Sequence, residues 1–573
     1  MFLPFADWRP DVSDLNGRTS QRMQNVVPTD SGYAPWLDLQ PFTNSLPAPC
    51  RGYFVARHSS GVFIFAGTID ELYLLDNSTL SWNKVSKGGG PYTPLASDAM
   101  WQFAQFNDLV LATQRNEDLQ SFDMGTPSAF ADVAGSPPNA GSIAVIGSFL
   151  VLGDLASDPF GIAWSAINDI TGWTPGTNLS DAQTFPAGGR VLRVEGVAQG
   201  VGMILQEGGI RRMAFLPGDT DFVFQIDELR DDCGLLSQYA VATHAGRVYF
   251  LSTKGFVAAG IDGSMEPIGE ERVDRTFLGN SADPAHADLA YDSAQPQLVQ
   301  AAADPRNNRV VWAYKSIAGL AEQFDRVLVY HITRQRWALA AVSGEFLAQV
   351  VRPALTLESL DAIAPGALPI VDVDDNGSGE IRVTVASTAT LTTGDVRTIS
   401  GVGGTTEANG TWTLTVIDGT DFDLDGSAFS NEYTSGGVVA GFLDQLPFSL
   451  DDVSTATLPG LSAFSGDHRL GFFTGSPVEA RLETPEQRAE SRRATINNVW
   501  PQTDADTAYV SIAKRERLSE TPTDTPEYGM LEDGHVPVFE EARNGRIVMR
   551  IPAGTIWTYA RGVEVEAGDG GRW

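Results

Sequence analysis

The sequence is poor in cysteine, in long apolar runs and in basic residues. Its 573 residues include only two cysteines, Cys50 and Cys233, so a disulfide scaffold is excluded and a reducing cytoplasm is the expected place of synthesis. No window approaches the roughly 18 apolar residues of a membrane-spanning helix. The opening MFLPFADWRPDVSD lacks the basic start and apolar core of a secretory signal. We therefore expect a soluble protein with no membrane span.

Basic residues are outnumbered by acidic ones, 39 to 72, which gives a net charge of −33. Binding nucleic acid by neutralising its phosphates is therefore not expected, because duplex DNA carries one negative charge per about 1.7 Å. A conduit through which DNA slides without sticking could use the same repulsion. Plain solubility would also explain the excess, and both interpretations stay open.

Helical periodicity is scarce, whereas 58 glycines and 32 prolines favour strands and turns. Between Gly61 and Val342 one unit recurs, made of an apolar strand, a tight turn, a second strand and a polar corner, often with a tryptophan opening the next strand. Clear copies span residues 61–82, 161–173 and 308–337. This repeat predicts a β-propeller of five to seven blades. Alternating apolar residues would face neighbouring blades, among them Val248, Phe250 and Phe256.

The predicted fold is mostly β: a β-propeller with an inserted small β-module and a C-terminal β-domain. Residues 1–50 are expected to form an extended arm anchored by its scattered aromatic residues, Phe2, Phe5, Trp8, Tyr33 and Trp36. Residues 51–367 would form the blades. A short helix over residues 270–280 would cap a blade edge.

The sequence changes in character after the blades. Residues 368–442 are rich in Thr, Gly and Asp and interrupt two flanks that look like one segment, which indicates an inserted module. Residues 443–573 would close the propeller and form the C-terminal β-domain. That domain carries arginines that we expect to face partners: Arg469, Arg481, Arg488, Arg492, Arg493, Arg515 and Arg517.

No pattern predicts a catalytic, cofactor or metal site. In the stretch 372–380, Asp372, Asp374 and Asn376 imitate a calcium loop, but Val383 stands where a bidentate Glu is required, which favours a turn. Cys233 follows two aspartates, whose charge disfavours a thiolate, so a buried structural cysteine is the better interpretation.

Other candidate motifs also favour structural roles. The six histidines, His244 among them, have no metal-ligand spacing. Three aspartates fall in turns, where their side chains would bind their own backbone: Asp76, Asp169 and Asp262. The glycine runs at 87–90 and 401–404 lack the Lys-Ser/Thr of a phosphate loop. We therefore expect a protein that is not an enzyme and has no cofactor.

Several segments resemble tail structural proteins of short-tailed bacteriophages. These are GRVYFLSTKGFVAAGIDGSMEPIGEERVDRTF (246–277), residues 303–315 and 327–342, the opening 3–36, and the closing 468–484 and 556–573. The resemblance covers most of the chain apart from the insert. It implies the tail hub, or nozzle, family, also called packaged-DNA stabilisation proteins.

Such proteins form a propeller-containing ring, usually a homo-hexamer, beneath the portal and adaptor of the virion tail. The resemblance implies assembly in the host bacterial cytoplasm, contacts with tail fibre or needle proteins, retention of the packaged genome, and passage of duplex DNA during ejection without sequence-specific binding. We expect acidic side chains to line that lumen. The insert resembles a small β-module of phage structural proteins and, distantly, the small β-domain of ubiquitin-activating enzymes, without that enzyme's chemistry.

Two alternatives stay open. A carbohydrate-binding or polysaccharide-cleaving propeller protein of the tail would use exposed tryptophans to stack on sugars and a carboxylate pair for acid/base work. The inserted module could instead be a receptor-binding tip.

Overall fold

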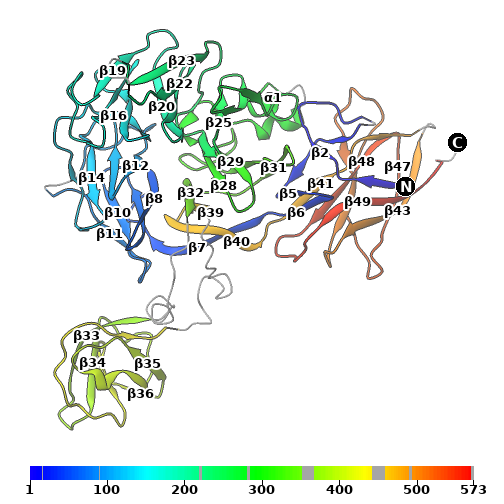
Figure 1. The fold of residues 1–573 in the computed structure, drawn as a ribbon. Coiled ribbons are helices and arrows are strands. Elements are labelled where there is room, and N and C mark those ends of the chain that lie inside the picture. Colours follow the sequence, from blue (N-terminus) through cyan, green and yellow to red (C-terminus); the bar gives the residue numbers. More distant parts are fainter. Residues whose placement is uncertain are drawn as a thin grey trace.

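The computed structural model describes residues 1–15, 17–88, 91–218, 222–280, 284–350, 367–441, 459–489 and 493–569. Regular structure in these residues is almost entirely strand. The chain forms a β-propeller, an inserted β-barrel and a C-terminal β-sandwich (Figure 1). The predicted fold class, mostly β with a propeller, an inserted module and a C-terminal β-domain, is confirmed.

Seven blades of four strands form the propeller, each running from an inner to an outer strand; six are separate four-stranded sheets, and the strands of blade 6 belong to a larger sheet. The first three are β8 (Gly52–His58), β9 (Gly61–Gly67), β10 (Leu72–Leu75), β11 (Trp82–Lys84); β12 (Gln102–Phe106), β13 (Leu109–Thr113), β14 (Gln120–Asp123), β15 (Ala131–Asp132); and β16 (Ala140–Ile146), β17 (Phe149–Leu155), β18 (Gly161–Trp164), β19 (Asp181–Thr184). The next three are β20 (Val191–Ala198), β21 (Val201–Gln206), β22 (Ile210–Phe215), β23 (Phe224–Arg230); β24 (Val241–His244), β25 (Arg247–Ser252), β26 (Gly255–Gly260), β27 (Met265–Pro267); and β28 (Gln300–Asp304), β29 (Arg309–Tyr314), β30 (Arg326–His331), β31 (Arg336–Ala340).

The seventh blade is assembled from three distant parts of the chain. Its strands are β32 (Phe346–Val350), β39 (Gly460–Phe464), β40 (Arg469–Pro477) and β7 (Leu37–Ser45). The chain therefore leaves blade 7 after its inner strand, β32, to form the insert, and returns to it at the second strand, β39. The outer strand comes from the N-terminal segment, which was expected to be an arm, and its pairing with β40 closes the ring.

A separate hydrophobic cluster fills each of the seven junctions between neighbouring blades. Between blades 4 and 5, Val248 and Phe250 pack against Met203. Phe256 points to the other side of its sheet, where it contacts Trp312 and Trp337 of blade 6. The predicted alternation is confirmed, because Tyr249 and Leu251, which alternate with Val248 and Phe250 along β25, lie in the cluster on the opposite side of the sheet.

The junction between blades 7 and 1 is built like the other six, so the ring has no gap. Phe464 of blade 7 contacts Tyr53 of blade 1 edge to face at 5.8 Å. This contact resolves the open blade number to seven. A closed ring has no exposed sheet edge around its circumference except the short outer strands.

The first 36 residues are built into the C-terminal sandwich. One sandwich sheet contains β1 (Phe2–Pro4), β5 (Val26–Thr29), β6 (Gly32–Pro35), β43 (Ala494–Thr503), β47 (Val536–Ala542) and β49 (Ala560–Asp569). The N-terminal ammonium group donates to the Val565 carbonyl at 2.7 Å. The described residues therefore begin and end in this sandwich (Figure 1).

The second sandwich sheet is continuous with blade 6. Strand β4 (Met23–Gln24) pairs with β31 on one side and β41 (Ala480–Glu483) on the other. Beyond β41 lie β42 (Gln487–Arg488), β44 (Tyr509–Arg515), β45 (Thr523–Asp524), β46 (Tyr528–Gly529) and β48 (Asn544–Ile551). Asn25, at φ 60°, fixes this bridge, because its amide donates to the Glu479 carbonyl at 2.7 Å and its side-chain oxygen accepts from Ala341.

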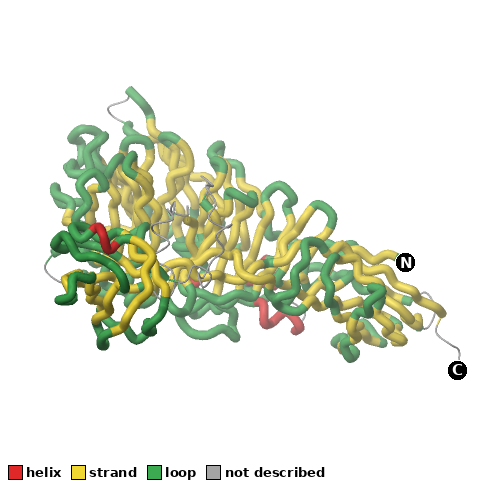
Figure 2. Tube along the Cα trace, turned by 90° about the horizontal axis from the view of Figure 1, so that it is seen from below, coloured by secondary structure: helices red, strands yellow, loops and turns green. Residues whose placement is uncertain are grey.

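Four of the five expected aromatic anchors are buried, namely Phe5, Trp8, Tyr33 and Trp36. Phe2 is the exception, because its side chain lies on the outer face of the sandwich and is 54% exposed. Phe5, Trp8 and Tyr33 belong to one hydrophobic cluster that blades 5 and 6 share with the sandwich. The propeller and the sandwich therefore have a common core. Figure 2 shows their strands following one another in one continuous body.

The insert is a closed barrel with its own hydrophobic core. Its strands are β33 (Leu368–Asp375), β34 (Ile381–Val385), β35 (Val396–Ser400), β36 (Gly410–Val416), β37 (Asp421–Leu424) and β38 (Val438–Val439). The calcium-like stretch is the turn between β33 and β34, where Asp375 accepts from Gly377 and Gly379 and Asn376 accepts from Ser378. The interpretation of that stretch as a turn is confirmed.

The helix expected over residues 270–280 is a single turn, α1 (Asp274–Phe277), because glycines and tight turns flank it. Three short 3-10 segments accompany it: Pro284–Leu289, Pro296–Leu298 and Thr406–Ala408. The carboxylate of Asp11 accepts the Arg275 and Thr276 amides at 2.8 Å each. Such capping satisfies amides that so short a helix leaves free.

Asp274 is buried beside this cap. Its carboxylate accepts the Phe256 amide at 3.0 Å. A Cβ at Gly269 would lie 1.9 Å from the same carboxylate, so glycine is required there. Burial raises the pKa of Asp274 from 3.8 to about 7, and the nearby Asp11 and Glu270 add to the rise.

Replacing Phe42 of β7 by Ala should lower the free energy of unfolding by about 3–5 kcal/mol, as expected for a buried aromatic side chain. The Phe42 ring packs edge to face on Phe472 at 5.3 Å in the closing blade. Phe2→Ala is the matched control and should change it by less than about 0.5 kcal/mol, because Phe2 is exposed. Denaturant unfolding measures both; equal effects would contradict the closing role of β7.

The Asp274 carboxyl should make the protein less stable as the pH rises from about 4 to about 7, because a raised folded pKa means that the folded state binds the proton more tightly. Over this pH range the carboxyl should lower the free energy of unfolding of the wild type by on the order of 3 kcal/mol. Asp274→Asn should remove this pH dependence. Asp262→Asn is the control, because hydrogen bonds from Ser264 lower the pKa of Asp262. Thermal unfolding midpoints across this pH range test it; parallel curves for wild type and Asp274→Asn would refute it.

Candidate functional site

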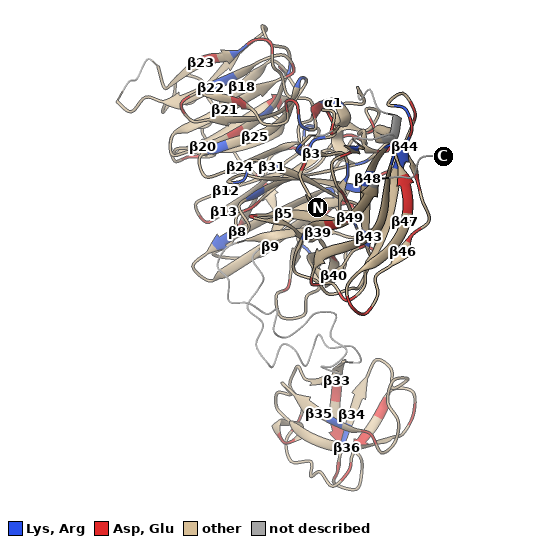
Figure 3. Ribbon diagram, turned by 90° about the vertical axis from the view of Figure 1, so that its right-hand side faces the viewer, with Lys and Arg blue, Asp and Glu red and all other residues tan. Residues whose placement is uncertain are grey.

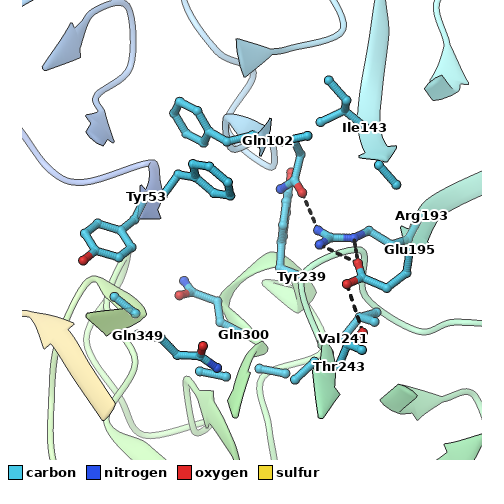
Figure 4. A pocket seen from close by; sticks show the side chains of 18 of the residues that line it. Tyr53, Gln102, Ile143, Arg193, Glu195, Tyr239, Val241, Thr243, Gln300 and Gln349 are labelled. Atoms are coloured by element: carbon cyan, nitrogen blue, oxygen red, sulfur yellow. Dashed lines mark hydrogen bonds and ion pairs between the residues drawn. The ribbon is translucent and has the colours of Figure 1, made fainter. Parts of the chain in front are cut away.

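The central channel of the propeller is lined by the inner strands of all seven blades and encloses about 510 Å³ (Figure 4). Each inner strand has only one strand partner among the described residues, so its other edge faces the channel. Small side chains occupy much of the wall: Ala104, Ala144, Gly196, Ala242, Ala301 and Ala348.

One ion pair carries the charge of the described channel lining. The Arg193 guanidinium donates to one oxygen of Glu195 at 3.0 and 2.9 Å, and the other oxygen accepts from the Thr243 hydroxyl at 3.0 Å. A further guanidinium nitrogen contacts Gln102 (Figure 4). Each charged group is satisfied by a neighbour, so the lining described is close to neutral.

Glutamine side chains close the free strand edges near the channel. Gln300 of blade 6 accepts the Leu347 amide at 2.7 Å and donates to the Glu345 carbonyl at 3.2 Å, so it ties blade 6 to the inner strand of blade 7. Gln105 of blade 2 bonds both the amide and the carbonyl of Arg57 in blade 1. These amides satisfy backbone groups that would otherwise need water.

The channel is too small for duplex DNA, because a space of about 510 Å³ holds only a small part of a double helix whose major groove alone is about 12 Å wide and 8.5 Å deep. The acidic walls expected around DNA are therefore not those of this channel, which has Glu195 as its one carboxylate among the described lining residues.

The residues weighed for chemistry have structural surroundings. Cys50 and Cys233 are both buried and free, which confirms the structural interpretation of Cys233. His244 contacts Asn308 at 3.3 Å. Within the described ranges no group of three or more His, Cys, Asp or Glu side chains is arranged to hold a metal ion.

The turn aspartates behave as predicted. Asp76, Asp169 and Asp262 each accept from the backbone amide and hydroxyl of a residue two positions on, Ser78, Thr171 and Ser264. Hydrogen bonds to the charged form lower the pKa of Asp169 and Asp262. The glycine run at 401–404 forms a turn bridged to Ser435, and that at 87–90 lies partly outside the described residues.

Charges of both signs are distributed over the propeller and sandwich, whereas the insert is mainly acidic (Figure 3). Residues 367–441 contain 11 acidic and two basic side chains. One of the two, Arg382, forms a bidentate ion pair with Asp423, in which its guanidinium donates to both carboxylate oxygens, at 2.7 and 3.0 Å.

Three of the arginines expected to face partners are used within the chain. Arg469 donates to the Thr43 carbonyl of the closing strand at 2.8 Å, Arg481 pairs with Glu483 and Asp524, and Arg515 pairs with Glu486. Arg481 and Arg515 neutralise the buried carboxylates Glu483 and Glu486 of the sandwich, and Arg469 binds a backbone carbonyl of blade 7. Contact of these arginines with partners stays a prediction. Arg493 and Arg517 reach the surface, and Arg492 lies outside the described residues.

The chain matches no protein-family model and no curated protein sequence. Among solved structures it is similar to a quinonprotein alcohol dehydrogenase-like protein from Bacteroides thetaiotaomicron, at 11% identity and TM-score 0.31, over 51% of this chain and 66% of that one. The chain thus spans just under two thirds of that protein. U3-55K (8%, TM-score 0.33, 70% of this chain and 98% of that one) and the RRP9 WD40 repeats (8%, TM-score 0.32, 68% and 99%) are also similar. Similarities this low bear on neither activity nor partners.

In the part of the chain that the structure covers, no helix has the length and apolar character to span a bilayer.

Gln300→Met should destabilise the protein by about 1–3 kcal/mol, because two buried backbone groups of blade 7 lose their partner while side-chain volume is kept. Gln349→Met, also in the channel lining, is the matched control and should be close to neutral. Denaturant midpoints measure both. Equal midpoints would show that the glutamine bridge between blades 6 and 7 contributes nothing.

Proposed function

We propose that the chain is a non-enzymatic structural protein of a bacteriophage tail, a hub or nozzle that forms a ring below the portal and adaptor. In this role it retains the packaged genome and passes DNA during ejection. The observation that carries the proposal is the resemblance of its opening, blade and closing segments to tail proteins of short-tailed phages.

The arrangement of those segments in space supports it. Residues 246–277 and 303–342 form most of blades 5 and 6, the opening 3–36 packs on them, and residues 468–484 and 556–569 form adjoining strands of blade 7 and the sandwich. Much of this contiguous body shares one core. The segments that resemble this family are far apart in the sequence but lie next to one another in the fold.

The charge of the chain is consistent with a conduit. A net charge of −33 repels phosphates rather than holding them. Since one propeller cannot admit duplex DNA, the path would lie on the axis of a ring of several copies. Closed rings of this kind use two different surfaces on each copy.

Partners would be neighbouring copies in a homo-hexamer, the adaptor and portal, and tail fibre or needle proteins. The sandwich is the natural place for such contacts, because it projects beyond the propeller (Figure 1) and carries the surface residues Arg493 and Arg517. The insert could serve as a receptor-binding tip.

Polysaccharide cleavage is less well supported. Glycosidases place two carboxyl groups about 5–9.5 Å apart across the scissile bond. Glu195 is the one carboxylate among the described residues of the channel, and its negative charge is neutralised by Arg193.

Negative-stain electron microscopy of the purified protein tests the proposal. We expect rings of several copies around a central hole, and no retention of a fluorescent DNA duplex at physiological salt. The insert-deleted chain, with residues 367–441 replaced by a short Gly-Ser linker, is the comparison and should still form rings. Monomers at high protein concentration, or release of reducing sugar from host polysaccharide, would contradict the proposal.

A further inference from the structure

The seam where blade 7 meets blade 1 contains a buried carboxylate, Glu345. Its side chain is 5% exposed and directly precedes β32, the inner strand of blade 7. One carboxylate oxygen lies 2.6 Å from Nδ1 of His468, and the other accepts the Cys50 amide at 3.3 Å. Cys50 leads into β8 of blade 1, so this carboxylate ties the last blade of the ring to the first.

The closing strand β7 ends at the same place. His468 lies in the turn between β39 and β40, at φ 61°, and its carbonyl accepts the Leu46 amide at 2.9 Å. The Ser45 hydroxyl donates to the Asp467 carbonyl at 2.7 Å. Residues 45–50 therefore pass from blade 7 to blade 1 beside this turn, and Glu345 contacts both the turn and the end of the passage.

His468 supplies the positive charge that faces Glu345. The other titratable groups at the seam come from blades 1 and 7: Cys50, Arg51, Tyr53, Asp467 and Arg469. Burial raises the pKa of the Cys50 thiol and of the Tyr53 hydroxyl, so both stay uncharged. The two arginines donate to backbone carbonyls, and Asp467 adds negative charge. Among the described groups, His468 is therefore the one cation in contact with the Glu345 carboxylate.

The charges of this pair respond to pH in the same direction. Burial raises the pKa of the Glu345 carboxyl, and the charge of His468 and the Cys50 amide offset part of that rise. Because the closed seam then binds the carboxyl proton more tightly than an open one, closure weakens as the pH rises. His468 is partly exposed, and an imidazole loses its charge between about pH 5 and 8. A buried carboxylate without its counter-charge is costly, so both groups loosen the seam at higher pH.

We propose that Glu345 and His468 form a proton-sensitive latch, which holds the propeller ring closed at acidic pH and lets blades 7 and 1 separate more often as the pH rises above neutral. Opening breaks the contacts of Glu345 with His468 and Cys50. The rest of the propeller stays folded, because the other six junctions have hydrophobic clusters of their own. This latch goes beyond the proposed tail-hub role and does not depend on it.

The two cysteines of the chain allow a direct test. Cys50 lies in the core of the seam and Cys233 in the core between blades 4 and 5, and both are buried free thiols. The full-length protein is treated with methyl methanethiosulfonate between about pH 5.5 and 8.5, across the range in which imidazole titrates. Peptide mass spectrometry gives the modification rate of each thiol. Opening of the seam exposes Cys50 alone, whereas global unfolding exposes both, so the ratio of the two rates measures the latch.

The ratio of the Cys50 rate to the Cys233 rate should rise about tenfold over this range in the wild type, the scale by which a charge-assisted hydrogen bond exceeds a neutral one. Glu345→Gln should keep the ratio low at every pH, because it removes the buried charge and keeps an oxygen that accepts the Cys50 amide. His468→Asn should raise the ratio at about pH 6, because asparagine tolerates a positive φ and keeps a side-chain donor but carries no charge.

His535→Asn is the matched control. Nδ1 of His535 lies 2.5 Å from the Asp533 carboxylate in the turn before β47 of the sandwich, outside the seam. This substitution should leave the ratio and its pH dependence unchanged.

Two results would overturn the proposal. One is a wild-type ratio that stays constant from acidic to alkaline pH. The other is a ratio that rises in Glu345→Gln as it does in the wild type, because the pH dependence would then come from other groups. His468→Asn serves as the second variant if Glu345→Gln does not fold, and a wild-type profile in it would have the same meaning.

Discussion

The structure depends on the pairing of β7 with β40, through which the N-terminal segment supplies the last strand of the last blade. Six blades are each made from one continuous stretch of chain, but the seventh needs strands from residues 37–45, 346–350 and 460–477. Closing the ring therefore requires contacts between residues more than 400 positions apart. Loop-closure entropy for such contacts must be offset by buried area, here that of Phe42, Phe464 and Phe472.

The same constraint joins the propeller to the sandwich. Once β7 is in place, the preceding residues are held along blade 6, where β4 joins the two sheets and Asp11 caps α1. The common core of blades 5 and 6 and the sandwich follows from that path. The propeller and the sandwich therefore share one core, whereas the insert has a core of its own.

Local patterns in the sequence predicted much of the fold. Alternation at Val248 and Phe250 identified a blade strand, and Asp76, Asp169 and Asp262 identified turns, because these features depend on neighbouring residues alone. The seventh blade was not predicted, since its strands are distant in sequence and β7 contains Pro41 within a polar segment. The number of blades stayed open for the same reason.

The candidate sites were less predictable than the fold. The channel glutamines Gln105 and Gln300 come from separate blades, so no sequence spacing marks them. Trp36 looked like an anchor and is buried as one, but its unpaired indole nitrogen is visible only in three dimensions. Arginines such as Arg469 looked available to partners until their internal acceptors were known.

Amide hydrogen exchange followed by mass spectrometry tests the closing role of β7 most directly. Peptides from residues 37–45 should exchange as slowly as those from β39 and β29, because strands of one closed ring open together. Fast exchange in residues 37–45 beside slow exchange in β39 and β40 would contradict the account, since the ring would then be closed without its N-terminal strand.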